Sequence, residues 1–186
     1  ATGRTSDCDL CIAGKYISDA TNANQHDGED DCIVCSAGKY STATGRPNDC
    51  DLCIPGKYIS DTTTATKHDN ETDCTNCSAG SYQNGVGQAC EACPAGRFSI
   101  AGEGMTSSNV CDNKCSVGKW SVEKGLTSND ECTLCALGKF MPENVAAGQS
   151  ADTCQVCPNG FYTSGRGQTN CTACPVGTFL NDPENK

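Results

Sequence analysis

The chain has 186 residues, a formal net charge of −10 and 18 cysteines. Leu, Ile, Val and Phe make up only about 13% of it, too little apolar area to hold a conventional globular core against the entropy of the chain. The acidic charge disfavours nucleic acids and anionic membrane surfaces as partners. No apolar run reaches the roughly 18–20 residues of a membrane span, so we expect no membrane insertion in this segment. A conventional enzyme with a packed α/β core is excluded.

The cysteines form nine pairs along the chain, eight of them Cys-x-x-Cys and the sixth with one extra residue. In chain order the pairs are Cys8/Cys11, Cys32/Cys35, Cys50/Cys53, Cys74/Cys77, Cys90/Cys93, Cys111/Cys115, Cys132/Cys135, Cys154/Cys157 and Cys171/Cys174. Each second cysteine is followed by x-x-Gly-x-aromatic, and nine of the ten aromatic residues occupy that register. The chain therefore reads as a continuous array of about nine repeats over residues 1–186.

Within the array, residues 7–48 match residues 49–90 at 25 of 42 positions, which indicates a duplicated two-loop block. The sequence Lys-Tyr-Ile-Ser at 15–18 and at 57–60 predicts brief strands. The Gly-, Asn- and Thr-rich segments that follow the motifs predict turns. We expect a positive φ at each motif glycine, and we expect the aromatic two residues later to lie over the next crosslink.

Three chemistries could use so many cysteine pairs. Zinc tetrathiolate sites have a compatible spacing, but nine pairs cannot be divided into four-ligand sites without one left over. Redox catalysis needs a dithiol at a helix start, and nine copies on a helix-poor chain make no sense as active sites. Structural disulfides in an oxidising compartment fit the cysteine density, the even count and the missing core. The sequence thus predicts disulfides, with no metal and no cofactor.

The motif at residues 90–98, Cys-Glu-Ala-Cys-Pro-Ala-Gly-Arg-Phe, resembles the ephrin-receptor-like cysteine-rich repeat and, more distantly, the cysteine-rich modules of tumour-necrosis-factor receptors. The copies with Pro94, Pro158 and Pro175 after the second cysteine fit it best. The resemblance covers nearly the whole chain. It implies a small disulfide-rich fold: an elongated extracellular rod of tandem repeats with short β-hairpins, little helix and no large core. It implies no particular ligand.

The resemblance also implies that each second cysteine bonds the first cysteine of the next pair. The implied bonds are Cys11–Cys32, Cys35–Cys50, Cys53–Cys74, Cys77–Cys90, Cys93–Cys111, Cys115–Cys132, Cys135–Cys154 and Cys157–Cys171. Each would close a loop of 13–21 residues, worth about 3 kcal/mol in the chain-entropy account. The alternative pairs cysteines one-to-three and two-to-four in blocks of four. The duplication suits that scheme, but it leaves Cys171 and Cys174 with each other.

In the first scheme Cys8 and Cys174 have no partner inside the segment. Both belong to unfinished repeats, so we expect them to bond adjoining repeats. The neighbour would be a second copy of the chain, joined end to end, or another part of a longer parent chain from which this segment was cut. A heterologous head-to-tail contact of this kind propagates as a filament unless it closes a ring.

The acidic loop at 26–31 and its duplicate at 68–73 could hold calcium through several carboxylates. Their spacing is not that of an EF-hand, so we favour solvated turns and predict no metal site. The two histidines, His26 and His68, occupy equivalent positions and are interpreted as copies of one surface residue. No serine or cysteine has a plausible base and orienting carboxylate, so no catalytic site is predicted.

Three sequons predict N-linked glycans, at Asn70, Asn76 and Asn170. The sequons at Asn76 and Asn170 have a cysteine in the middle position, which can hinder modification, so Asn70 is the strongest candidate for a glycan. Thr62, Thr63 and Thr64 form a candidate stretch for O-linked glycans.

The function expected from these features is that of an extracellular or cell-surface structural glycoprotein, part of a surface filament or coat. The alternative is the ligand-binding or stalk ectodomain of a cell-surface receptor. Ligand-binding surfaces concentrate exposed aromatic and arginine residues, whereas here the aromatics share one internal register and the four arginines are scattered. This favours the structural role. An extracellular enzyme has no supporting constellation.

Overall fold

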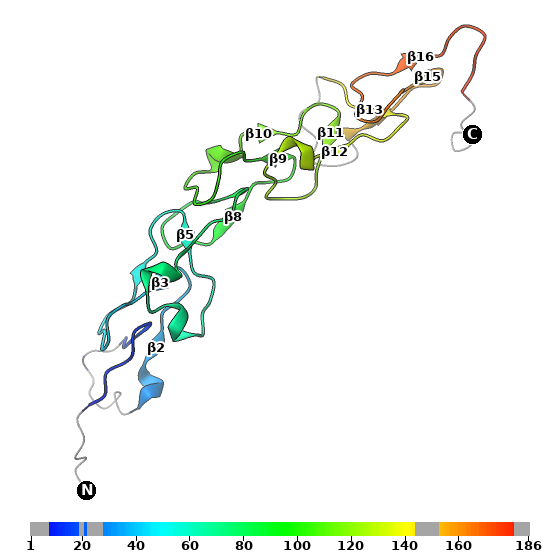
Figure 1. The fold of residues 1–186 in the computed structure, drawn as a ribbon. Helices are drawn as coiled ribbons and strands as arrows, with labels where there is room; N and C mark the ends of the chain where they lie inside the picture. The colour runs from blue at the N-terminus through cyan, green and yellow to red at the C-terminus, as the bar shows by residue number, and fades with distance from the viewer. Residues whose placement is uncertain (1–7, 19–20, 22–27, 144–152, 181–186) are drawn as a thin grey trace. The chain divides into compact units, whose positions relative to one another are not determined.

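The computed structural model describes residues 8–18, 21, 28–143 and 153–180. In these ranges short β-strands alternate with turns and 3-10 helices, and there is no α-helix (Figure 1). The strands are β1 (Lys15–Tyr16), β2 (Ile33–Val34), β3 (Lys39–Tyr40), β4 (Asp51–Leu52), β5 (Lys57–Tyr58), β6 (Thr75–Asn76), β7 (Ser81–Gln83), β8 (Cys90–Ala92), β9 (Arg97–Phe98), β10 (Asn113–Lys114), β11 (Lys119–Trp120), β12 (Thr133–Leu134), β13 (Lys139–Phe140), β14 (Gln155–Val156), β15 (Phe161–Tyr162) and β16 (Thr172–Ala173).

The 3-10 helices are η2 (Glu29–Asp31), η3 (Ala65–Lys67), η4 (Glu71–Asp73), η5 (Ser108–Cys111) and η6 (Asn129–Glu131). Four of them, η2, η4, η5 and η6, end at or directly before the first cysteine of a pair. Among the described residues, no helix has the length and apolar character needed to cross a bilayer. The small disulfide-rich repeat fold expected from the sequence is confirmed.

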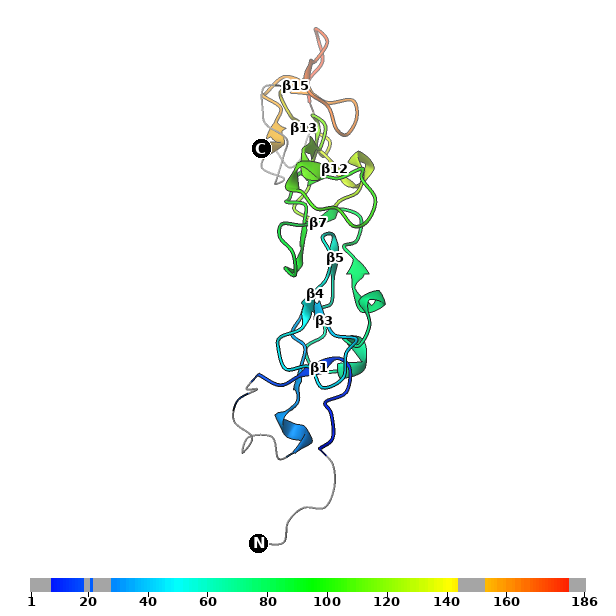
Figure 2. The same ribbon diagram turned by 90° about the vertical axis from the view of Figure 1, so that its left-hand side faces the viewer.

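Each hairpin joins the strand after one cysteine pair to the strand inside the next pair. In the first hairpin Lys15 lies opposite Val34 and Tyr16 opposite Ile33. The strands β3 and β4 lie side by side (Figure 2) and pair in the same register. The other pairs with this register are β5 with β6, β9 with β10, β11 with β12, β13 with β14, and β15 with β16. The predicted strands at 15–18 and 57–60 exist, but each is two residues long. The reason is visible at Ile17, whose N–H leaves the hairpin and donates to Arg46 O of the following loop.

The chain divides into two compact units. One comprises residues 1–77, 83–91 and 104–106, and the other comprises 78–82, 92–103 and 107–186. The same local construction recurs in each unit, so each is described by itself.

The core of each unit consists of small clusters around disulfides. In the first unit Cys53, Cys74 and Ile59 form one cluster, with Tyr40 packed against it. Tyr40 belongs to the motif before the Cys53–Cys74 bond, so the aromatic lies over the next crosslink, as predicted. A flat ring covers much area at little cost in side-chain entropy.

The second unit repeats this arrangement twice. Phe98 packs with Leu126 and the cysteines of the Cys115–Cys132 bond. Trp120 packs against Cys135, Cys154 and the fully buried Met141. In these three clusters the aromatic residue of one motif packs against the disulfide of the next.

Candidate functional site: a disulfide ladder with glycine seats

Eight disulfides join the second cysteine of one pair to the first cysteine of the next, which we call the disulfide ladder. They are Cys11–Cys32, Cys35–Cys50, Cys53–Cys74, Cys77–Cys90, Cys93–Cys111, Cys115–Cys132, Cys135–Cys154 and Cys157–Cys171. Their Cα atoms lie 5.3–5.9 Å apart, within the usual range for disulfides. This is the consecutive pairing, not the one-to-three pairing. Cys8, exposed, and Cys174, half-buried, are free thiols.

The same backbone hydrogen bond recurs from motif to motif along the chain. The N–H of every second cysteine from Cys35 onward donates to the carbonyl of the preceding motif glycine, at 2.8–2.9 Å in all eight copies. The motif glycines all have φ between +73° and +86°, a backbone region that favours glycine. The positive φ predicted from the sequence is therefore confirmed in all nine motifs.

The motif glycines also form contacts that the sequence analysis missed. A Cβ at Gly14, Gly38, Gly56, Gly80 or Gly118 would lie 2.0–2.3 Å from the carbonyl oxygen of a residue in the loop two motifs further along. The five oxygens belong, in the same order, to Ala65, Gly87, Gly104, Gly125 and Gly167. We call these motif glycines seat glycines, because another loop lies against each of the five. At Gly138, Gly160 and Gly177 a Cβ would meet nothing within 4 Å. Disulfides thus link neighbouring motifs, and seats link motifs that are two apart.

The loops that fill the seats are held from a second side. Three of them contain a glycine whose N–H donates to the second cysteine of the preceding motif: Gly104 to Cys77 O, Gly125 to Cys93 O and Gly167 to Cys135 O, each at 2.8 Å. Gly45 donates in the same way to Cys11 O at 2.7 Å, but its loop fills none of the five seats named above. Leucine side chains complete the contact, since Leu10, Leu52 and Leu134 lie 2.3–2.6 Å from the Cβ positions of Gly45, Gly87 and Gly167. Gly87 and Gly167 are therefore each enclosed between a leucine and a seat glycine. This leaves little room for a side chain.

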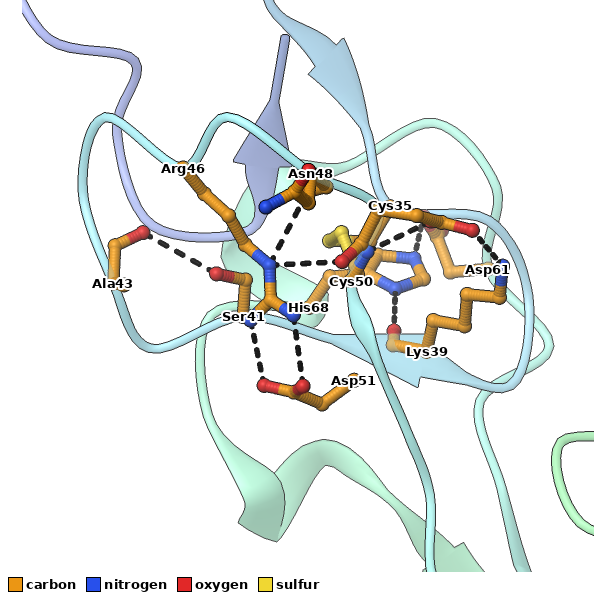
Figure 3. Close-up of a disulfide and its surroundings, with 11 residues drawn as sticks. Cys35, Lys39, Ser41, Ala43, Arg46, Asn48, Cys50, Asp51, Asp61 and His68 are labelled. Carbon is orange, nitrogen blue, oxygen red and sulfur yellow. Dashed lines mark hydrogen bonds and ion pairs between the residues drawn. A yellow bond between two sulfur atoms is a disulfide. The ribbon is translucent and has the colours of Figure 1, made fainter. Parts of the chain in front are cut away.

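The loop after the third motif is held by His68 instead of by a glycine (Figure 3). The His68 carbonyl accepts the N–H of Ser41 at 2.8 Å. Its imidazole Nδ1 lies 2.7 Å from Lys39 O and, because a carbonyl only accepts, Nδ1 carries a proton. The ring is fully buried, so the interpretation of His68 as a surface residue was wrong. The short η3 helix ends directly before His68 and turns the chain so that the imidazole ring is buried, although the residues next to His68 in the sequence are polar. His26, its duplicate, lies outside the described residues.

Charged groups around the Cys35–Cys50 disulfide fix the neighbouring loop. Arg46 donates to both carboxylate oxygens of Asp51, at 2.6 and 2.8 Å. These hydrogen bonds lower the pKa of Asp51 and raise that of Arg46. Lys39 forms an ion pair with Asp49, which lowers the pKa of the Asp49 carboxyl. Because these side chains are partly exposed, each pair contributes little to stability, and we assign them a local positioning role.

The acidic loops form turns in the described residues. The Asp73 carboxylate accepts the N–H of Asn70 at 2.9 Å, and the Asp31 carboxylate accepts that of Gly28 at 3.0 Å. Among the described residues, no group of three or more His, Cys, Asp or Glu side chains is arranged to hold a metal ion. Residues 26–27 of the first acidic loop lie outside the described residues.

The glycosylation candidates lie at the surface. Asn70, Asn76 and Asn170 are exposed, as are Thr62, Thr63 and Thr64. The side-chain oxygen of Asn70 accepts hydrogen bonds from the N–H and the hydroxyl of Thr72, both at 3.0 Å. The side-chain oxygen of Asn76 lies 3.5 Å from the Cβ position of Gly104, so Asn76 sits against a loop.

The Asp61 carboxylate anchors the His68 loop and gives it a predicted pH dependence. It accepts the N–H groups of Thr63 and Thr64 at 2.9 and 2.7 Å, which lowers the pKa of Asp61 to about 2. An unperturbed Asp titrates near about 3.9. The stabilisation from ionised Asp61 is therefore present above about pH 4 and is lost as the pH falls through about 2.

We expect the carboxyl ¹³C signal of Asp61 and the amide signal of Thr64 to titrate together with a midpoint near pH 2. In the Asp61→Asn variant the Thr64 amide should show no such transition. A midpoint near 4 in the wild type would show that the two amide hydrogen bonds do not hold the carboxylate.

Comparison with known proteins supports the resemblance noted from the motifs. Residues 144–185 match the family model described as tyrosine-protein kinase ephrin type A/B receptor-like. No curated protein matches the chain. The matched segment is similar to an ephrin-receptor-like cysteine-rich repeat, and the chain as a whole consists of tandem cysteine-rich repeats. Repeats of this kind are typically extracellular and non-enzymatic.

Proposed function

We propose that this chain is an extracellular structural glycoprotein, a component of a surface filament or coat built from disulfide-laddered repeats. The observation that carries the proposal is that the motif residues make contacts between repeats. In the rungs, seats and clusters described above, motif cysteines, glycines and aromatic rings contact other repeats. An array in which each repeat contacts only repeats one or two motifs away can be extended by adding further copies of the same repeat.

The surface chemistry of the described residues also favours a structural role. The aromatic residues Tyr82 and Phe98 are buried, and Arg46 and Arg97 are paired with Asp51 and Asp112. Interfaces that bind protein ligands gain most energy from buried aromatic and arginine anchors, and these residues are already used internally. The described residues offer no nucleophile, base and orienting carboxylate in contact with one another, and we propose no enzymatic activity.

A receptor ectodomain or stalk is the second candidate, favoured by the match of residues 144–185 to the ephrin-receptor-like family. Negative-stain electron microscopy of the native material distinguishes the two. Filaments support the structural proposal. Isolated particles of uniform length anchored to a membrane would overturn it in favour of the receptor.

We propose that Cys8 and Cys174 bond adjoining repeats, because each is the half of a rung whose other half is absent from the ladder. Two thiols form this bond by losing two electrons and two protons to an oxidant, such as a small disulfide that is itself reduced to two thiols. The partner is a second copy of the chain or a further repeat.

Asn70 is expected to carry an N-linked glycan. Its hydrogen bonds with Thr72 use the side-chain oxygen, whereas the glycan is attached through the nitrogen, and the residue is exposed. We expect lower occupancy at Asn76 and Asn170, where the next residue is a disulfide cysteine. Glycopeptide mass spectrometry of native material measures all three, with the Asn70→Gln variant as the control. Unmodified Asn70 throughout would contradict the prediction. Thr62, Thr63 and Thr64 remain candidates for O-linked glycans.

A further inference from the structure

The sequence contains two Asn-Gly dipeptides, Asn84-Gly85 and Asn159-Gly160. In such a dipeptide the glycine nitrogen can attack the side-chain amide carbon of the asparagine, because glycine has no side chain that blocks the approach. The attack closes a five-membered ring, so it requires rotation about the Cα–C bond of the asparagine. The local structure therefore decides which of the two dipeptides reacts in the folded chain.

Asn84 lies at the surface, in the loop directly after strand β7. Its side chain forms no hydrogen bond with any described residue, and neither does the N–H of Gly85. No backbone hydrogen bond closes a turn across the Asn84–Gly85 peptide, since the bond from Gln88 N–H to Gly85 O, at 3.1 Å, lies after it. The asparagine side chain and the glycine nitrogen are thus free to meet.

Asn159 is also exposed, but it lies inside a closed turn. The N–H of Phe161 donates to Pro158 O at 3.0 Å across this turn, and the Gly160 carbonyl accepts the N–H of Cys174 at 2.8 Å. Rotation about the Cα–C bond of Asn159 would break both hydrogen bonds, which stabilise the turn. Asn159 is therefore hindered where Asn84 is not.

We propose that Asn84 is a site of spontaneous deamidation in the folded chain. The Gly85 nitrogen forms a bond to Cγ of Asn84, the Cγ–Nδ2 bond breaks, and the proton of the Gly85 amide leaves with the departing ammonia. Water then adds to one of the two carbonyls of the cyclic imide and opens the ring. The product is aspartate when the new C–N bond breaks, and isoaspartate when the original peptide bond breaks. Water is the only co-reactant, and nothing is oxidised or reduced.

The isoaspartate product lengthens a segment that is fixed at both ends. The buried Gln83 side chain donates to Gln88 O at 2.8 Å, and the Gly87 carbonyl lies against the seat glycine Gly38. Isoaspartate inserts one methylene group into the main chain between these anchors. The amide of Gln88, which donates to Gly85 O, should then exchange about tenfold faster, because this hydrogen bond is lost. An unchanged rate would contradict the loosening of the loop.

The test incubates the oxidised 186-residue chain in mildly alkaline buffer and measures both dipeptides by peptide mass spectrometry, with isoaspartate separated from aspartate by chromatography. A reduced, unfolded sample incubated in parallel gives the two rates without the fold. Gly85→Ala is the matched variant. A Cβ there would lie 3.2 Å from the exposed, movable side chain of Gln88, and Gly85 does not adopt a positive φ. The variant therefore folds, while its methyl group hinders the attack.

We expect Asn84 in the folded chain to deamidate at least about tenfold faster than Asn159, because two backbone hydrogen bonds restrain Asn159. In the unfolded sample the two rates should be similar, and Gly85→Ala should slow the reaction at Asn84 alone. Equal rates in the folded chain, the same ratio in both samples, or no isoaspartate at Asn84 would overturn the proposal. None of these outcomes bears on the filament function, which rests on other contacts.

Discussion

Replacement of Gly80 by alanine is expected to raise the amide exchange rate of Gly125 about 100-fold. A Cβ at Gly80 would lie 2.0 Å from the carbonyl oxygen of Gly125 and 3.1 Å from that of Leu126, so the loop must leave the seat. The left-handed backbone costs an alanine roughly 1–2 kcal/mol. Displacement of the loop also breaks the Gly125–Cys93 and Ser99–Leu126 hydrogen bonds, each worth about 1 kcal/mol. The total of about 3 kcal/mol corresponds to about two orders of magnitude.

Gly138→Ala is the matched control for this prediction. Gly138 has φ +75° against +77° for Gly80, but its Cβ would meet nothing within 4 Å. The variant therefore carries only the backbone strain, and the exchange rate of the Cys157 amide, which donates to Gly138 O, should rise about tenfold or less. Native-state hydrogen exchange read by NMR measures both amides. Equal effects of the two substitutions would show that seats contribute nothing beyond the strain of φ.

Removal of the Cys53–Cys74 disulfide is expected to loosen one part of the chain and leave the rest intact. The bond closes a loop with a sequence separation of 21, worth about 3 kcal/mol in the chain-entropy account. Both cysteines are buried in a cluster with Ile59 and Tyr40, so the double alanine variant also loses packing. We expect about 3–5 kcal/mol less local stability.

The amide of Gly38, which donates to Ile59 O, should exchange 100-fold faster or more. The amide of Gly167, in the second unit, should be unchanged, because repeats contact only their near neighbours. Cys8→Ala, which removes a free exposed thiol, is the control and should change neither amide. Loss of protection at Gly167 in the double variant would mean that the chain unfolds as a single cooperative unit.

Local features of the repeat could be predicted from the sequence because each depends on residues close together. The positive φ of the seat glycines follows from glycine at a fixed distance after each cysteine pair, and the position of Tyr40 over the Cys53–Cys74 bond follows from the aromatic register. The hairpins lie where the sequence places β-branched and aromatic residues next to a turn. The strands are shorter than predicted because the residue after each strand leaves the hairpin, as Ile17 does when its N–H donates to Arg46 O of another loop.

The seats could not be predicted from single motifs, because each joins residues two motifs apart, such as Gly38 and Gly87. A signal was nevertheless present: a second glycine follows the motif glycine by seven residues at Gly45, Gly87, Gly125 and Gly167. A recurring second glycine indicates another close backbone approach. His68 was missed because a run of polar residues around it resembles a solvated turn, and only the fold of η3 buries the ring.

Disulfide mapping by tryptic digestion of the unreduced, denatured chain tests the ladder most directly. Cleavage after Lys15, Lys39 and Lys57 releases peptides 5–15, 16–39 and 40–57, which contain the first three cysteine pairs. The ladder predicts that all three stay joined in one disulfide-linked species, through Cys11–Cys32 and Cys35–Cys50, until a reductant is added. One-to-three pairing would instead release 5–15 joined to 16–39 alone, and recovery of that separate pair would contradict the ladder and the seats built on it.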